Sequence, residues 1–304
     1  MISEEIPDAL AGERIDRVVA MLTGCTRAEA SAAIEADTVT IDDGVVAKPS
    51  VRVRAGQRVS VSVSPVQPEA LPQPDPTVEI RVVYEDDDVI VIDKPTGLIV
   101  HPGAGHRGST LVNGLLVRFP ELADVGEAHR PGIVHRLDKG TSGLMVVARN
   151  VHAYEDLVEQ LSTHTVSRRY LALVWGHFTT LHGTIDAPVG RSRRDPLKMT
   201  ISADGREART HYEVLSRFEE PKPTSLVACQ LETGRTHQIR VHLRSIGHSV
   251  VGDDLYNGQK PSIPMDHPFL HATQLSFDHP GTGELVTFDS PLPEELQHIL
   301  DRLS

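Results

Sequence analysis

The sequence predicts an α+β protein with a small domain at the N-terminus and a larger domain after it. Beyond residue 78, strand and helix patterns alternate irregularly and several segments resemble hairpins, which indicates a mixed, largely antiparallel sheet flanked by helices and loops. Five prolines within 65–77 mark a linker. It separates a compact segment over 13–64 from the larger domain over 78–304. The length of 304 residues fits one large domain plus a small one.

Two short helices and a small sheet are predicted in the first segment. The first helix covers 14–24, where Gly24 is the C-terminal cap; its apolar residues have the spacing of one helix face: Ile15, Val18, Val19 and Leu22. A capping box over Thr26–Glu29 opens the second helix. Strands are expected over 38–46, around an Asp-Gly turn, and over 51–63, on both sides of a glycine turn.

The same periodicities predict helices and strands beyond the linker. Helices are expected over 109–119, 150–164 with Asn150 as the cap, and 236–247, ended by Gly247. Strands are expected over 88–95, 143–149, 168–176 and 225–231, and a hairpin over 198–215.

The composition predicts a cytoplasmic protein that does not contact membranes. No apolar run approaches the roughly 18 to 20 residues that span a bilayer, and the acidic stretch over 1–10 lacks a secretory signal pattern. Cys25 and Cys229 stand far apart without CxxC spacing, which favours small buried residues over a disulfide or a zinc site.

The net charge of −12 by itself argues against a nucleic-acid partner, but the distribution of the charges along the chain matters more than their sum. Residues 66–128 carry eleven acids against four bases, whereas 129–150 carry four bases against one acid and 230–250 carry three against one. The acidic excess therefore lies outside two locally basic segments, which leaves room for a basic cleft on an acidic protein.

Two patterns that suggest a cofactor or a metal fail on their context. The GxGxxG at 103–108 is separated from the preceding strand by KPTGLIVHP, so it does not form the tight strand-to-helix turn of a dinucleotide site. His237, His242 and His248 surround one predicted helix, but the first two are five apart and no HExxH is present. We expect neither a cofactor nor a metal.

The stretch HRLDKGTSG at 135–143 places one carboxylate, Asp138, between Arg136 and Lys139. Nearby cations favour the ionised form of an acid, which is the form that a nucleophile or base needs. No second carboxylate lies in the motif, and no GxSxG pattern occurs in the chain. Taken alone, the stretch is compatible with a structural salt bridge as well as with a catalytic acid.

Four motifs in order resemble the RluA/RluD family of pseudouridine synthases: DKPTGLIVHP at 93–102, HRLDKGTSGLMVVAR at 135–149, SRRYLALVWG at 167–176 and LETGRTHQIRVHL at 231–243. The resemblance implies that Asp138 is the catalytic aspartate, that Tyr170 stacks on the target uracil, and that Arg240 pairs with Asp138. It also implies that Arg136 fills the gap left by a flipped base. Flipping is needed because uridine carbons are inaccessible inside a helix.

The segment over 13–64 resembles the S-four-type (αL) RNA-binding domain. In that family, basic residues of the helices and the adjoining loop face RNA. The corresponding residues here are Arg14, Arg17, Arg27, Lys48 and Arg52. The alternative for each is a solvated surface charge.

The reaction that the resemblance implies is the isomerisation of specific uridines in RNA to pseudouridine. The substrate that it favours is large-subunit ribosomal RNA. Attack by Asp138 at C1′ of the sugar and at C6 of the ring both stay open. Two alternatives share the RNA partner: a synthase that acts on transfer RNA, and a non-catalytic assembly factor, which is expected to lack Asp138, Tyr170 or Arg240. We expect a monomer that binds ribosomal RNA or pre-ribosomal particles.

Overall fold

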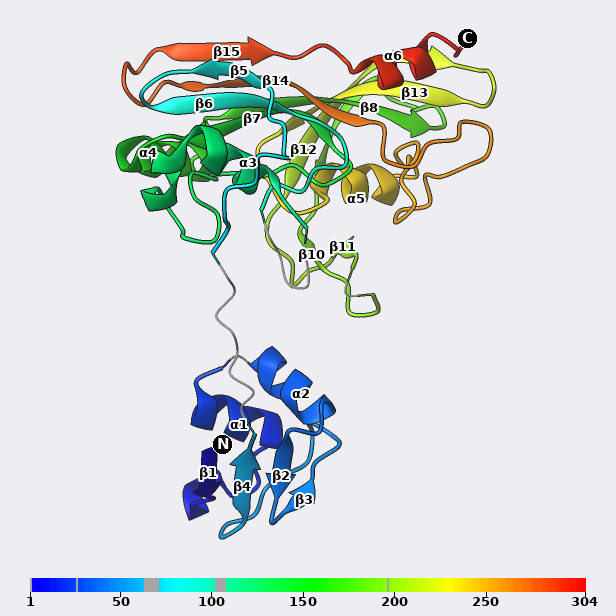
Figure 1. Ribbon diagram of the computed structural model, residues 1–304. Coiled ribbons are helices and arrows are strands. Elements are labelled where there is room, and N and C mark those ends of the chain that lie inside the picture. Colours follow the sequence, from blue (N-terminus) through cyan, green and yellow to red (C-terminus); the bar gives the residue numbers. More distant parts are fainter. Residues whose placement is uncertain (1, 26, 63–70, 102–107, 196) are drawn as a thin grey trace. The chain divides into compact units, whose positions relative to one another are not determined.

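The computed structural model describes residues 2–25, 27–62, 71–101, 108–195 and 197–304. The chain divides into two compact units, Met1–Ala70 and Leu71–Ser304, and each has its own hydrophobic core (Figure 1). Among the described residues, no helix is long and apolar enough to cross a membrane.

The first unit packs two helices against a four-stranded antiparallel sheet. Helix α1 (Ile15–Thr23) ends at Gly24, whose φ of 72° lies in the left-handed region that favours glycine. Val19 of α1 and Ile34 of α2 (Arg27–Glu35) are buried in one core with the sheet. The elements are β1 (Ile2–Glu5), the 3-10 helix η1 (Asp8–Leu10), α1, α2 (Arg27–Glu35), β2 (Val39–Ile41), β3 (Gly44–Val45) and β4 (Arg58–Val61), in the sheet order β1-β4-β2-β3.

The first strand expected within 51–63 does not form. Residues 51–54 contain a single bridge, because their backbone bonds to the entrance of α1, where the Ile15 N–H donates to the Val51 oxygen at 2.7 Å. The other strand expected there is β4, and the turn over 38–46 is confirmed by β2 and β3. Thr26 of the expected capping box lies outside the described residues.

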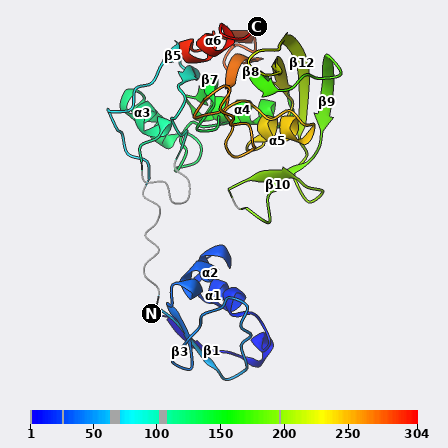
Figure 2. The ribbon, with the colours of Figure 1, turned by 90° about the vertical axis from the view of Figure 1, so that its right-hand side faces the viewer.

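The second unit is the predicted α+β fold around a largely antiparallel sheet. Its order is β5-β6-β7-β14-β8-β13-β12-β9, with β15 added to β14, and only the β7–β14 pair among these is parallel. Figure 2 shows β9 at one edge. The elements are β5 (Val82–Glu85), β6 (Val89–Lys94), α3 (Leu111–Arg118), η2 (Pro120–Asp124), β7 (Ser142–Ala148), α4 (Val151–Ser162), β8 (Ser167–Trp175), β9 (His182–Asp186), β10 (Val189–Arg191), β11 (Met199–Ile201), β12 (Arg209–Phe218), β13 (Thr224–Leu231), α5 (Gln238–Ser245), β14 (Leu270–Asp278), β15 (Leu285–Asp289) and α6 (Glu294–Leu300).

Helices cover both faces of the central strand β8. Helix α5 packs into the core that contains Ala172, whereas α6 packs with the next residue, Leu173, so the two helices lie on opposite faces (Figure 1). Helix α4 begins at its expected cap, where the Asn150 side chain accepts a hydrogen bond from the Ala153 N–H at 2.8 Å.

The hairpin predicted over 198–215 is wrong. Strand β11 pairs with β10, and β12 pairs with β9 and β13. The turn at Gly205 packs on β10, because the Arg206 N–H donates to the Val189 oxygen at 3.0 Å, and so the chain leaves β11 before β12 begins. The alternation of apolar and polar residues predicted that strands form here, but it did not predict which strands pair with each other.

Candidate active site

The loop that carries Asp138 is held by the parallel pair of β7 and β14. Gly143 of β7 lies opposite Ala272 of β14. A Cβ on Gly143 would lie 2.2 Å from the Ala272 carbonyl oxygen, and the φ of Gly143 is 110°, so this approach requires glycine. The turn is closed by the Thr141 N–H, which donates to the Asp138 main-chain oxygen at 3.0 Å. The sheet therefore determines where Asp138 lies.

Asp138, Tyr170 and Arg240 line one cleft of about 690 Å³ in the second unit. Among the described residues that line this cleft, six are arginines and one, Asp138, is a carboxylate. An acidic protein thus carries a basic cleft, as its charge distribution allowed. Clustered arginines around a cavity are the electrostatic signature of a nucleic-acid site.

Arg240 connects Asp138 to a buried second carboxylate. Its Nη1 donates to Asp138 Oδ2 at 3.1 Å, while Nε and Nη2 donate to the two oxygens of Asp253 at 2.7 and 2.8 Å. Burial lowers the pKa of Arg240, but the hydrogen bonds and charges of both carboxylates raise the pKa overall. The guanidinium is therefore a permanent cation beside Asp138.

Tyr170 contributes the aromatic surface of the cleft. It is 6% exposed on β8, and it shares the main core with Ala172 two residues further along the strand. Burial raises the pKa of Tyr170 to about 12, although the positive charge of Arg168 opposes the shift. The phenol is therefore protonated at neutral pH.

Arg136 is exposed and lines the same cleft. Its Nη1 lies 3.3 Å from His101 Nε2. Burial lowers the pKa of His101 to about 4, with a further contribution from the Arg136 charge, so the imidazole is neutral and its Nε2 accepts the hydrogen bond. Among the described residues, this long hydrogen bond is the contact recorded for the Arg136 guanidinium.

His237 and Tyr256 also lie near Asp138, and neither was predicted to act there. His237 precedes α5 with a φ of 57°, and its Nε2 lies 3.9 Å from Asp138 Oδ2. Its Nδ1 is 2.9 Å from the Tyr256 hydroxyl, and burial lowers the pKa of His237. Asp253 and Tyr256 belong to GDDLYNG at 252–258, whose paired acids and flanking glycines were the available signal.

The five basic residues predicted in the first unit have different partners. Arg14 and Arg27 both bind Asp16, at 2.9 and 3.2 Å, and Arg17 binds Glu13. Arg52 donates to the Gly12 main-chain oxygen at 2.5 Å, and Lys48 is exposed. Four of the five are therefore engaged by groups of the first unit itself.

The three histidines weighed as metal ligands have separate partners. The ring of His242 bonds to Thr210 and to the Ala187 oxygen, and His248 Nδ1 bonds to the Trp175 oxygen. Ligand atoms of Asp86, Asp88 and His279 lie within 4.8 Å of one another, but Asp86 Oδ2 already binds the Tyr84 hydroxyl and His279. The GxGxxG loop lies outside the described residues, except for Gly108.

Comparisons with known proteins agree with this geometry. The family model described as RNA pseudouridylate synthase matches residues 88–245, and the S4 domain model matches residues 13–59. "Ribosomal large subunit pseudouridine synthase D" of Xanthomonas campestris is 46% identical, over 98% of this chain and 91% of its own length. "Uncharacterized RNA pseudouridine synthase YlyB" of Bacillus subtilis is 44% identical, over 96% of this chain and 94% of its own. The solved structure of "Human RNA Pseudouridylate Synthase Domain Containing 1" aligns with a TM-score of 0.59 and 28% identity, over 75% of this chain and 90% of that one.

A basic cleft around one carboxylate, on a chain that also carries an S4 domain, defines an enzyme that acts on RNA. The chain belongs to the RNA pseudouridylate synthase family. It is an isomerase that converts uridine in RNA to pseudouridine. The family resemblance of its motifs and of its first segment is confirmed.

Proposed function

We propose that this synthase modifies uridines of large-subunit ribosomal RNA in the cytoplasm, with Asp138 as its catalytic carboxylate. The ion pair between Asp138 and Arg240 inside the basic cleft carries the proposal. The name and near-complete coverage of the Xanthomonas relative support the target class. We also infer that the enzyme acts as a monomer on ribosomal RNA or pre-ribosomal particles, since Asp138, Tyr170 and Arg240 all come from one chain.

The residues of the cleft divide the reaction between them. A uridine flipped out of the RNA lays its uracil beside Tyr170, whose ring restores stacking worth about 1–3 kcal/mol. Arg240 orients the Asp138 carboxylate toward the nucleotide, and Arg136 fills the vacated stack. The N1–C1′ bond breaks, the uracil turns, and the C5–C1′ bond forms. The proton leaves C5 and one is gained at N1, so no atom is lost overall.

We also propose that RNA contact in the first unit is made by Arg14, Arg17, Arg27, Lys48 and Arg52, and the match to the S4 domain model supports this assignment. Lys48 is the most available of these residues, because it is exposed and has no ion pair or side-chain hydrogen bond among the described residues, whereas Arg14 and Arg27 share the Asp16 carboxylate. Their expected contribution is contact with phosphates rather than with bases.

Tritium release from C5-labelled uridine tests the proposal, because the new C5–C1′ bond displaces that hydrogen. We expect release from an unmodified large-subunit ribosomal RNA transcript with wild type and with Arg118→Gln, whose arginine pairs with Glu85 outside the cleft. Asp138→Asn should release only background.

Three other results would contradict the proposal. Release from transfer RNA transcripts alone would overturn the target, and release by Asp138→Asn at the wild-type rate would overturn the role of Asp138. No release by wild type, together with tight RNA binding, would favour the non-catalytic assembly factor.

A further inference from the structure

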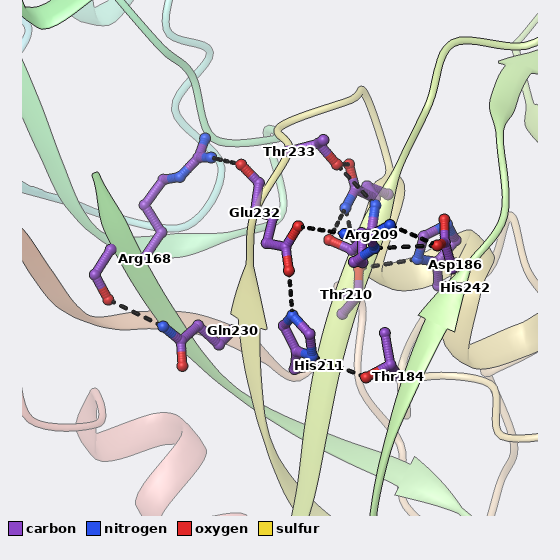
Figure 3. Close-up of polar contacts among 12 residues, drawn as sticks. Arg168, Thr184, Asp186, Arg209, Thr210, His211, Gln230, Glu232, Thr233 and His242 are labelled. Atoms are coloured by element: carbon purple, nitrogen blue, oxygen red, sulfur yellow. Dashed lines mark hydrogen bonds and ion pairs between the residues drawn. The ribbon is translucent and has the colours of Figure 1, made fainter. Parts of the chain in front are cut away.

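Arg168 is a buried cation for which the described part of the chain provides no carboxylate partner. It is 6% exposed, and its Nη2 donates to the Glu232 main-chain oxygen at 3.0 Å, as Figure 3 shows. Its Nε is buried and has no hydrogen-bond partner among the described residues. A buried, unpaired charge is costly unless a ligand compensates it.

Two more arginines of the cleft also lack an ion pair among the described residues, although Arg235 is half-buried and Arg206 is exposed. Arg235 donates from Nε to the Glu207 main-chain oxygen at 2.9 Å, and neither it nor Arg206 has an ion pair with a described carboxylate. The pKa of Arg235 is lowered by burial and then by the charges of Arg206 and Arg168. Arg240, by contrast, is paired on the same cleft wall with two carboxylates. The charge of Glu207 opposes the lowering of the Arg235 pKa, but no described carboxylate forms an ion pair with any of the three arginines.

A glycine keeps the space around Arg168 open. A Cβ on Gly234 would lie 2.6 Å from Arg168 Nη1, so any side chain at this position would displace the guanidinium. No positive φ requires glycine at this position. The close approach of the Arg168 guanidinium therefore explains why a residue without a side chain occupies position 234.

Arg168 lies close to Tyr170, the residue proposed to stack on the flipped uracil. Arg168 and Tyr170 are two residues apart on β8, so they share one face of the strand at a spacing of about 7 Å. This is roughly the separation between a uracil ring and the phosphate of its own nucleotide.

We propose that Arg168, Arg235 and Arg206 form an anion subsite for the backbone phosphate beside the flipped uridine. The inference rests on the proposed function, because it takes Tyr170 as the platform for the uracil. Guanidinium groups bind phosphate oxygens through short, charge-assisted hydrogen bonds, and Nη1 of Arg168, which faces Gly234 in the cleft, has no hydrogen-bond partner among the described residues. Since Arg168 is buried, the phosphate reaches it only when the nucleotide leaves the helix, so the subsite favours the flipped state.

The salt dependence of RNA binding tests the subsite without turnover. Asp138→Asn protein is titrated with an unmodified large-subunit ribosomal RNA transcript, and log K is plotted against log salt concentration. Adding Arg168→Gln or Arg235→Gln should make the slope less steep by about 1. Arg168→Lys should keep most of the slope, and Gly234→Ala should resemble Arg168→Gln without any change in charge. The control is Arg118→Gln, whose arginine pairs with Glu85 outside the cleft and whose loss should leave the slope unchanged.

A neutral methylphosphonate in place of one phosphate beside the target uridine identifies the ligand. The substitution should lower kcat/KM of wild type on the order of 10- to 100-fold and should have little further effect on Arg168→Gln. An unchanged salt slope in a folded Arg168→Gln would overturn the subsite, and Arg235→Gln replaces it if that variant fails to fold. Changed slopes without tritium release by wild type would instead contradict the proposed function and leave the subsite standing.

Discussion

Asp253 determines the direction in which Arg240 points. The carboxylate is fully buried and accepts two hydrogen bonds from the guanidinium, at 2.7 and 2.8 Å, which leaves Nη1 to meet Asp138. The Tyr256 N–H also donates to Asp253, at 3.2 Å, and the Arg240 guanidinium lies 5.1 Å from the centre of the Tyr256 ring. Asp253 is therefore a positioning residue for the cation beside Asp138.

Replacing Asp253 with Asn should weaken both stability and turnover. The variant leaves the Arg240 charge buried with only Asp138 to balance it, and breaking a buried pair in this way costs about 3–5 kcal/mol. We expect the free energy of unfolding in urea to fall by about 3 kcal/mol, and kcat for tritium release to fall more than KM rises.

The control for Asp253→Asn is Asp186→Asn, which breaks an exposed pair with Arg209. Exposed pairs contribute about 1 kcal/mol or less, so this variant should be nearly as stable and active as wild type. An equal loss of stability in the two variants would contradict the positioning role of Asp253.

The sequence predicted the motif-bearing residues better than their partners. Asp138, Tyr170 and Arg240 could be brought together because a family resemblance marks them, whereas Asp253 and Arg168 acquire their surroundings from contacts distant in sequence. Ser142 and His271, which join β7 to β14, are 129 residues apart. The exposed strands β1, β5 and β15 were missed because few of their side chains are buried, so they show little apolar alternation.

Tyr170→Phe should separate stacking from proton transfer. Since burial raises the pKa of Tyr170 to about 12, the pH profile of wild type should show no alkaline limb near pH 10, where an exposed tyrosine titrates. Phe keeps the ring, so RNA affinity should stay close to that of wild type while single-turnover rates fall. Tyr170→Leu should weaken binding of the flipped uridine by a further 1–3 kcal/mol or so. Unchanged affinity in Tyr170→Leu would contradict stacking.

Lys94 should make stability depend on pH. It is 1% exposed, its Nζ donates to the Pro95 and Leu98 oxygens, and burial lowers its pKa to about 8 from the ordinary 10.5. Between these values the unfolded state binds more protons, so stability rises with pH. The free energy of unfolding of wild type should gain about 1 kcal/mol over that of Lys94→Met from pH 7 to pH 9. If the free energies of unfolding of the two proteins change by the same amount from pH 7 to pH 9, Lys94 keeps its ordinary pKa and the prediction is wrong.

Gly143→Ala should displace the loop of Asp138. Gly143 and Gly283 both have positive φ, 110° and 71°, so alanine strains the backbone at each by about 1 kcal/mol. Nothing lies within 4 Å of a Cβ at Gly283, whereas a Cβ at Gly143 would meet the Ala272 oxygen at 2.2 Å and nitrogen at 2.6 Å. Gly143→Ala must therefore separate β7 from β14. The free energy of unfolding in urea should therefore fall by about 1–3 kcal/mol more in Gly143→Ala than in Gly283→Ala. Tritium release should fall in Gly143→Ala and stay unchanged in Gly283→Ala. Equal losses of stability, with tritium release intact in both variants, would show that the close approach of the strands does not hold the loop.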